Sequence, residues 1–75
     1  MKHDHLVDIK GMCCSAPVIR LAKEFAKFQA GDVVLVISDK SSMLNDIPAW
    51  CHMTGNELLK RESSEGLFNF WIGKH

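Results

Sequence analysis

The chain has 75 residues, and its nine basic and nine acidic side chains give a formal net charge of zero at neutral pH. This balance excludes a strong overall attraction to DNA or to an anionic membrane surface. Apolar residues make up 47% of the chain, enough for one small core, so we expect residues 1–75 to form a single domain.

The apolar stretches of the chain are short. No segment near the N-terminus has the apolar core of a secretory signal. The longest unbroken apolar run, VVLVI at residues 33–37, is far below the roughly 20 residues that cross a bilayer. We therefore expect a cytoplasmic protein without a membrane partner, in which the three cysteines are reduced.

The first half of the chain predicts a strand, a helix and a second strand. His5–Ile9 is expected to be a strand, and a helix is expected to begin at Pro17 and to end at a cap on Gly31. The apolar positions of this helix recur at helical spacing: Val18, Leu21, Ala22, Phe25 and Phe28. The β-branched run over residues 32–38 predicts a strand in the middle of a sheet.

The second half predicts another helix and a hairpin. The hydroxyls of Ser41 and Ser42 are expected to cap a helix that reaches about Met53, in which Pro48 marks a kink or the true start. Two strands, at residues 56–63 and 67–74, follow around a Glu65-Gly66 turn. The order β-α-β-α-β-β predicts an α+β fold, a two-layer sandwich with a four-stranded mixed sheet and two helices on one face.

Two adjacent cysteines follow the first predicted strand, in the segment GMCCSAP at residues 11–17. The segment is similar to the Gly-Met-x-Cys-x-x-Cys loop of heavy-metal-binding domains, in which two thiolates three positions apart hold a soft ion. Here Ala16 stands three positions after Cys13, and Pro17 three positions after Cys14, and neither has a ligand atom. A transient disulfide between the two cysteines is a further alternative, although neighbouring cysteines lie far from ordinary disulfide geometry.

A single reactive thiol at Cys14 fits the pattern best. Proline is favoured in the first turn of a helix, so Pro17 places Cys14 directly before a helix N-terminus. The free N–H groups there carry about half a positive charge and favour an anion. A cysteine in this setting is expected to have a lowered pKa, with Lys10 and Arg20 adding positive potential.

From about Leu6 to Ile72 the sequence resembles the TusA/SirA-like sulfur-carrier proteins. The features that carry the resemblance follow in order along the chain: GMCCSAP after the first strand, AGD before the second, DIP in the second helix, and the closing hairpin. The hallmark of that family is a Cys-Pro-x-Pro motif. Its cysteine falls on Cys14 and its second proline on Pro17, while Ser15 stands in place of the first proline and Cys13 precedes the motif.

The resemblance implies a two-layer βαβαββ sandwich and a role in sulfur relay. Cys14 would accept a sulfane sulfur as a persulfide and pass it to a partner protein, in the manner of a sulfurtransferase-type carrier without cofactor or metal. Cys13, Ser15 and Pro17 would support it, and the Ser15 hydroxyl could bind the anion or cap the helix. In the best-known case the donor is a cysteine desulfurase, and the sulfur ends in the 2-thiouridine of tRNA.

Four charged residues are candidates for partner docking. Arg20, Lys23 and Lys27 form a basic stripe on the helix that follows Cys14, either as a solvated outer face or as a surface for an acidic partner. Asp46, in the DIP segment, is either a helix cap or a partner contact. No aromatic residues interleave with the stripe, so the pattern does not favour direct contact with RNA.

Two other functions stay open from the sequence alone. One is a non-catalytic interaction or regulatory module of the same fold, because the first motif proline is missing. The other is a soft-metal binder through Cys13 and Cys14. Cys51, in the segment AWCHM, is expected in the core. Paired carboxylates, a Ser-His-Asp order, a phosphate-binding glycine loop and zinc spacing are all missing from the sequence, which argues against a conventional hydrolase or kinase.

Overall fold

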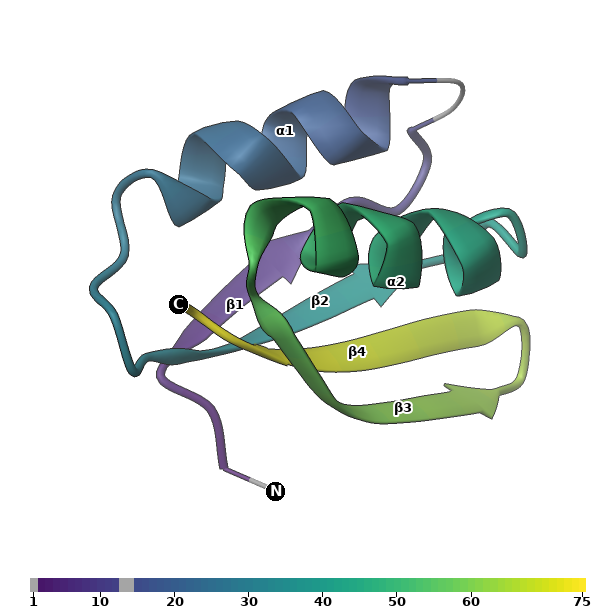
Figure 1. Ribbon diagram of the computed structural model, residues 1–75. Coiled ribbons are helices and arrows are strands. Elements are labelled where there is room, and N and C mark those ends of the chain that lie inside the picture. Colours follow the sequence, from purple (N-terminus) through teal and green to yellow (C-terminus); the bar gives the residue numbers. More distant parts are fainter. Residues whose placement is uncertain (1, 13–14) are drawn as a thin grey trace.

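The computed structural model describes residues 2–12 and 15–75. Within these residues the elements follow in the order β1 (His5–Asp8), α1 (Ala16–Phe25), β2 (Val33–Ser38), α2 (Met43–Thr54), β3 (Glu57–Ser64) and β4 (Leu67–Gly73). The sheet has the strand order β1-β2-β4-β3, with β1 parallel to β2 and the other neighbouring pairs antiparallel. Both helices lie on the same face of the sheet (Figure 1), which confirms the predicted two-layer α+β sandwich.

The core lies between the two central strands and the helices. Side chains alternate along each strand, and Val34 and Val36 of β2 lie beside Ile72 and Phe70 of β4, all with no exposed surface. The helices cover them with the buried side chains of Leu21, Phe25, Ile47, Trp50 and Cys51. Phe70 and Ile72, two positions apart on β4, therefore lie on the helix-covered face.

Helix α1 ends earlier than the sequence predicts. Its last residue is Phe25, whereas Gly31, expected to be its cap, lies in the following loop with a φ of +94°. Beyond Phe25 the N–H groups of Lys27 and Phe28 donate to carbonyl groups three residues earlier, the tighter pattern that often closes a helix. The Phe28 ring then stacks on His5 of β1, with 4.0 Å between ring centroids, so a contact with the sheet replaces a further helical turn.

The start of helix α2 differs from the sequence prediction in two respects. Ser42 is at the N-cap, but neither it nor the preceding Ser41 caps through a hydroxyl; the Ser42 side chain makes no capping hydrogen bond and the Met43 N–H donates to the Lys40 carbonyl instead. Pro48 lies inside the helix and does not mark its start.

The β3–β4 turn lies at Glu65 and Gly66, where the sequence predicts it. Glu65 and Gly66 have φ values of +52° and +78°, and the strands on either side pair from Ser64 and Leu67 onward. Positive φ at both central residues is the requirement of a type I′ turn, whose twist matches that of the strands.

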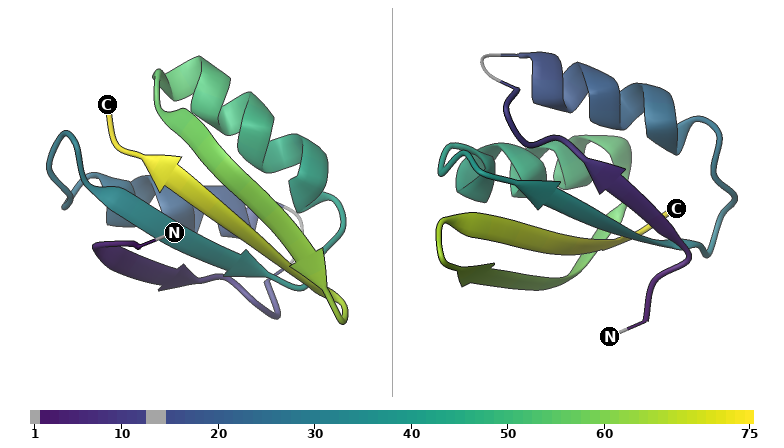
Figure 2. Two further views of the ribbon diagram at one scale, coloured as in Figure 1. Left: turned by 90° about the horizontal axis from the view of Figure 1, so that it is seen from below. Right: turned by 180° about the vertical axis from the view of Figure 1, so that it is seen from behind.

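The second face of the sheet carries no helix (Figure 2, left). Paired positions place Leu6, Leu35, Trp71 and Lys60 in one row across the four strands of this face. Leu6 is 56% exposed, whereas Trp71 is only 8% exposed and has the Lys60 ammonium 5.4 Å from its ring centre. In the part of the chain that the structure describes, neither helix combines the length and apolar character needed to span a membrane.

Candidate functional site

The predicted motif lies where β1 gives way to α1. Cys13 and Cys14 lie outside the described residues, and their neighbours on both sides define the site. Met12, on one side, is half-buried and packs against the core, and Ser15, on the other, is exposed at the N-cap of α1. Because β1 and β2 are parallel, the N-termini of both helices lie at this one end of the sheet (Figure 1).

The start of α1 has the features that suit a neighbouring anion. Pro17 is in the first turn and is buried, which anchors the helix start against the core. Among the described residues of that turn none is acidic, so no carboxylate of the helix itself neutralises its positive end. The backbone carbonyl of Ser15 accepts the Ile19 N–H at 3.1 Å, but the Ser15 side chain makes no capping hydrogen bond. The expectation that the Ser15 hydroxyl caps the helix is therefore wrong.

Two carboxylates hold the loop that leads to the cysteines, and a hydroxyl shapes the neighbouring loop after β2. The Lys10 N–H donates to Asp8 Oδ1 at 2.9 Å, and the Gly11 N–H donates to Asp39 Oδ1 at 3.0 Å. The Asp39 bond joins the β1–α1 loop to the β2–α2 loop. One residue before Asp39, the buried hydroxyl of Ser38 accepts the Lys40 N–H at 3.1 Å, and this bond shapes the β2–α2 loop.

Asp39 lies near two lysines at this end of the sheet. The Gly11 hydrogen bond is the largest cause that lowers the pKa of Asp39. Burial opposes it, and the weaker effects of the Lys40 and Lys10 charges lower the pKa further. Lys10 also lies 3.7 Å from the Asp8 carboxylate. The sequence analysis named Lys10 but missed Asp39, because no local pattern connects residues 28 positions apart.

The basic stripe is exposed, and Glu24 pairs with two of its members. Arg20 and Lys23 lie on α1, whereas Lys27 lies in the turn just after it, because the helix ends earlier than the sequence predicts. Glu24 lies between two of its members, with Oε1 3.2 Å from Arg20 Nε and Oε2 3.6 Å from Lys27 Nζ. Within the described residues Lys23 forms no ion pair. The i,i+4 and i,i+3 spacing around Glu24 was the signal in the sequence for this pairing.

Asp46 and Cys51 occupy different settings on α2. Asp46 is exposed in the first turn, so it belongs to the same end of the molecule as the cysteine loop. Cys51 is 3% exposed, and burial raises the pKa of its thiol to about 11. A thiol with that pKa is neutral at physiological pH, which fits the predicted core position.

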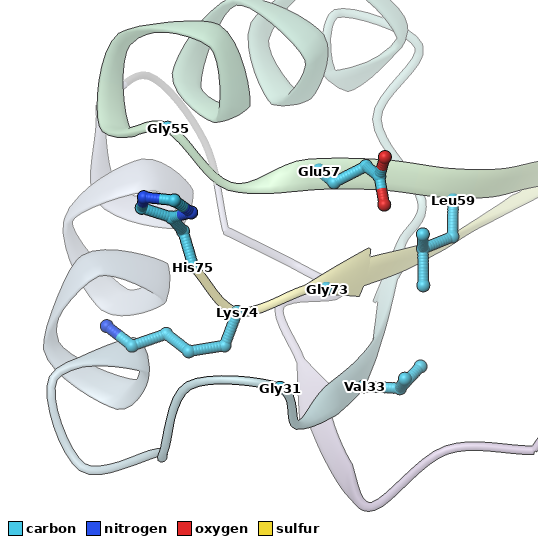
Figure 3. A pocket seen from close by; sticks show the side chains of 8 residues that line it. All are labelled: Gly31, Val33, Gly55, Glu57, Leu59, Gly73, Lys74 and His75. Atoms are coloured by element: carbon cyan, nitrogen blue, oxygen red, sulfur yellow. The ribbon is translucent and has the colours of Figure 1, made fainter.

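The described residues include a cavity but no cluster of metal ligands. Among the described residues no group of three His, Cys, Asp or Glu side chains is placed to hold a metal ion. A cavity of about 430 Å³ lies at the other end, where β2 and β3 begin and β4 ends (Figure 3). Its lining is formed by Gly31, Val33, Gly55, Glu57, Leu59, Gly73, Lys74 and His75.

Comparison with known proteins places this arrangement in a family. The family model described as "Sulfurtransferase TusA" matches residues 5–74, which include both cysteines and the whole sheet. This chain belongs to the TusA family. The sequence resemblance to TusA/SirA-like sulfur carriers is therefore confirmed.

Individual relatives of the TusA family match nearly the full chain. The sulfur carrier protein TusA of Pseudomonas entomophila is 38% identical over 72 residues, which cover 96% of this chain and 90% of the relative. YrkI of Bacillus subtilis is 31% identical over 74 residues, 99% of each chain. The solved SirA-like protein of Desulfitobacterium hafniense is 29% identical, with a TM-score of 0.74 over 93% of this chain and 96% of its own.

Proposed function

We propose that this protein is a sulfur-relay carrier that holds a sulfane sulfur as a persulfide on Cys14. The observation that carries the proposal is the match of residues 5–74 to the TusA family, together with relatives named as sulfur carriers. The sequence resemblance is what assigns the motif cysteine to Cys14. The described surroundings support it, because the motif is followed by a helix start without an acidic first turn. In this proposal residues 1–75 act as one domain in the cytoplasm.

The proposed transfer is an exchange between sulfur atoms. The Cys14 thiolate attacks the outer sulfur of a persulfide on the donor, a new S–S bond forms at Cys14, and the donor cysteine leaves as a thiolate. The S–S bond of the donor breaks as the new S–S bond forms, so there is no net oxidation, and the proton that the Cys14 thiol gave up is balanced by the one that the donor thiolate takes up. In the onward step the acceptor thiolate attacks the outer sulfur in the same way, and Cys14 leaves as a thiolate.

The residues around Cys14 have supporting roles in this scheme. Pro17 fixes the helix start, and the first turn supplies free N–H groups for the anionic persulfide. Ser15 leaves the backbone freer than the proline of the family motif would, and its hydroxyl makes no capping bond, so it is available to the anion. Cys13 is the neighbouring thiol whose contribution the experiment below separates.

The partners in this scheme are two proteins. A cysteine desulfurase or another sulfur donor loads Cys14, and a downstream acceptor protein unloads it. The exposed side chains of Arg20, Lys23, Lys27 and Asp46 are the proposed docking surface. Lys23 is the best candidate among the bases, since Glu24 already pairs with the other two. A route to tRNA 2-thiouridine is one destination that this chemistry allows.

Mass spectrometry of the intact protein tests the proposal. Purified protein is incubated with a cysteine desulfurase and cysteine, in parallel with the Cys13→Ser and Cys14→Ser variants. The expected result is a gain of one sulfur atom in the wild type and in Cys13→Ser, and none in Cys14→Ser. No gain in the wild type with several donors would favour the interaction module. Stoichiometric copper or zinc retained in the purified protein would favour the metal binder.

A further inference from the structure

Among the described residues, one side-chain hydrogen bond ties together the two loops at the cysteine end of the sheet. The backbone N–H of Gly11 donates to Asp39 Oδ1 at 3.0 Å. Gly11 belongs to the loop after β1, and Asp39 is the first residue after β2. The strands are already joined just before this point, where the Ile9 N–H donates to the Ile37 carbonyl at 2.9 Å.

The bond fixes the chain a short distance before the cysteines. Among residues 9–12, Gly11 makes the last hydrogen bond to another element, since the Met12 N–H reaches only the Ile9 carbonyl within the same loop. Gly11 has a φ of +78°, a conformation that a glycine adopts without strain. Three residues of chain span at most about 10 Å, so the position of Gly11 limits where Cys14 can be presented.

The charge of Asp39 cannot account for a favourable effect on a thiolate. A carboxylate near a thiol disfavours the thiolate and raises its pKa. The bond to Gly11 is the contact within this chain through which Asp39 can benefit sulfur transfer. The Gly11 hydrogen bond itself is the largest cause that favours the charged form of Asp39, and the charges of Lys40 and Lys10 add to it.

We propose that Asp39 is a positioning residue for sulfur transfer, which holds the Gly11 loop so that Cys14 is presented to its protein partners in one place. This inference rests on the proposed carrier function. A protein donor must bring its persulfide to a defined point, whereas a small reagent reaches an exposed thiol in many loop conformations. Loss of the bond therefore slows loading by a protein more than reaction with a small molecule.

The test compares three substitutions in a Cys13→Ser background. Asp39→Ala removes the acceptor, and Asp39→Asn keeps an acceptor oxygen without the charge. The matched control is Asp4→Ala, because Asp4 Oδ2 accepts the Val33 N–H at 2.8 Å in an equivalent bond at the far end of β1. Two rates are measured for each protein: sulfur loading by a cysteine desulfurase at limiting concentration, and alkylation of Cys14 by iodoacetamide.

The expected result is a selective defect in one variant. Asp39→Ala loads about 3- to 10-fold more slowly than the parent, the factor that corresponds to one net hydrogen bond. Asp39→Asn and Asp4→Ala stay within about twofold of the parent, as does alkylation in all three. Loading of Asp39→Ala at the parent rate overturns the proposal, as does an equal defect in Asp39→Asn, which would assign the effect to charge.

Two further measurements distinguish a failure of the positioning role from a failure of the variant to fold and from a failure of the proposed carrier function. If Asp39→Ala does not fold, Asp39→Glu takes its place, because it keeps the charge but displaces the carboxylate by one methylene, and the same slowing is expected. If the parent takes up no sulfur, the carrier function fails, and NMR tests the positioning role alone. The Gly11 amide proton should then shift upfield in Asp39→Ala but not in Asp39→Asn or Asp4→Ala, and an unchanged shift overturns the positioning role.

Discussion

At the scale of single residues, the chain places its thiols in contrasting settings. Cys51 is packed in the core, where burial raises its pKa to about 11, so it is neutral and shielded at physiological pH. The pair at 13–14 instead precedes a helix whose described first turn lacks acidic side chains. A thiolate is the nucleophilic form of cysteine; burial disfavours it at Cys51, and the positive end of a helix is the kind of setting that favours it. This contrast is the residue-level reason to place sulfur chemistry at the motif.

Asp32 contributes a pH-dependent part of the stability. Its Oδ2 lies 2.8 Å from His5 Nε2, and this bond, followed by one from the Gln29 N–H, lowers the pKa of Asp32 below its ordinary value of 3.8. A depressed pKa means that the stabilisation is present above the unfolded-state pKa and is lost as the pH falls through the folded-state pKa.

The substitution Asp32→Asn tests this dependence. Urea unfolding is followed from neutral pH down to about pH 2, which spans the titration of carboxylates. Wild type is expected to be the more stable protein near neutrality, and the two proteins should converge at the acid end. The matched control is Asp46→Asn, which removes an exposed carboxylate that accepts no hydrogen bond within the described residues. A wild-type advantage that persists unchanged at the lowest pH would contradict the assignment.

At the scale of elements, periodicity and turn residues predicted all six segments within the described chain. Periodicity and turn residues could not predict where α1 ends or how the loop before the cysteines is held, because contacts between distant parts of the chain determine both. Helix α1 ends before Gly31 because Phe28 stacks on His5, and the loop before the cysteines is fixed by Asp39. Both contacts join residues more than 20 positions apart, for which the sequence carries no local signal. The motif itself was visible only because its residues are contiguous.

In the β3–β4 turn, two substitutions are expected to change the free energy of unfolding in opposite directions. Glu65 has a φ of +52°, a conformation that costs about 1–2 kcal/mol for most L-residues and less for asparagine. We expect Glu65→Asn to raise the free energy of unfolding by about 0.5–1 kcal/mol. Gly66→Ala should lower it by about 1 kcal/mol, and purely through the backbone, since no atom lies within 4 Å of the added Cβ. Urea denaturation measures both, and a stabilised Gly66→Ala would show that the turn is not type I′.

At the scale of the whole molecule, the sheet has one covered and one uncovered face. The helices and the core occupy one side, while the row through Leu6 and Trp71 occupies the other. The helices begin at the end of the sheet where β1 and β2 finish (Figure 1). Gly11 in the loop after β1, Asp39 just after β2 and Asp46 in the first turn of α2 therefore share that end. The cavity at the opposite end stands apart from this arrangement.

The asymmetry of the two faces predicts unequal costs of truncation. Phe70 has no exposed surface, so Phe70→Ala should cost about 3–5 kcal/mol. That is a large share of the roughly 4–11 kcal/mol expected for a domain of this size. Leu6 is 56% exposed, and Leu6→Ala should cost less than about 1 kcal/mol. Chemical denaturation of the two variants compares the costs directly, and similar losses would mean that both faces are covered in solution.

The central claim is that Cys14 alone carries the sulfur, and a protein that retains only this cysteine tests it most directly. The double variant Cys13→Ser/Cys51→Ala is loaded by a cysteine desulfurase and then treated with dithiothreitol, while its intact mass and the released sulfide are measured. The account predicts a gain of one sulfur atom per chain, followed by its return as an equal amount of hydrogen sulfide. A protein that folds and gains no sulfur, while its counterpart with only Cys13 does, would contradict it.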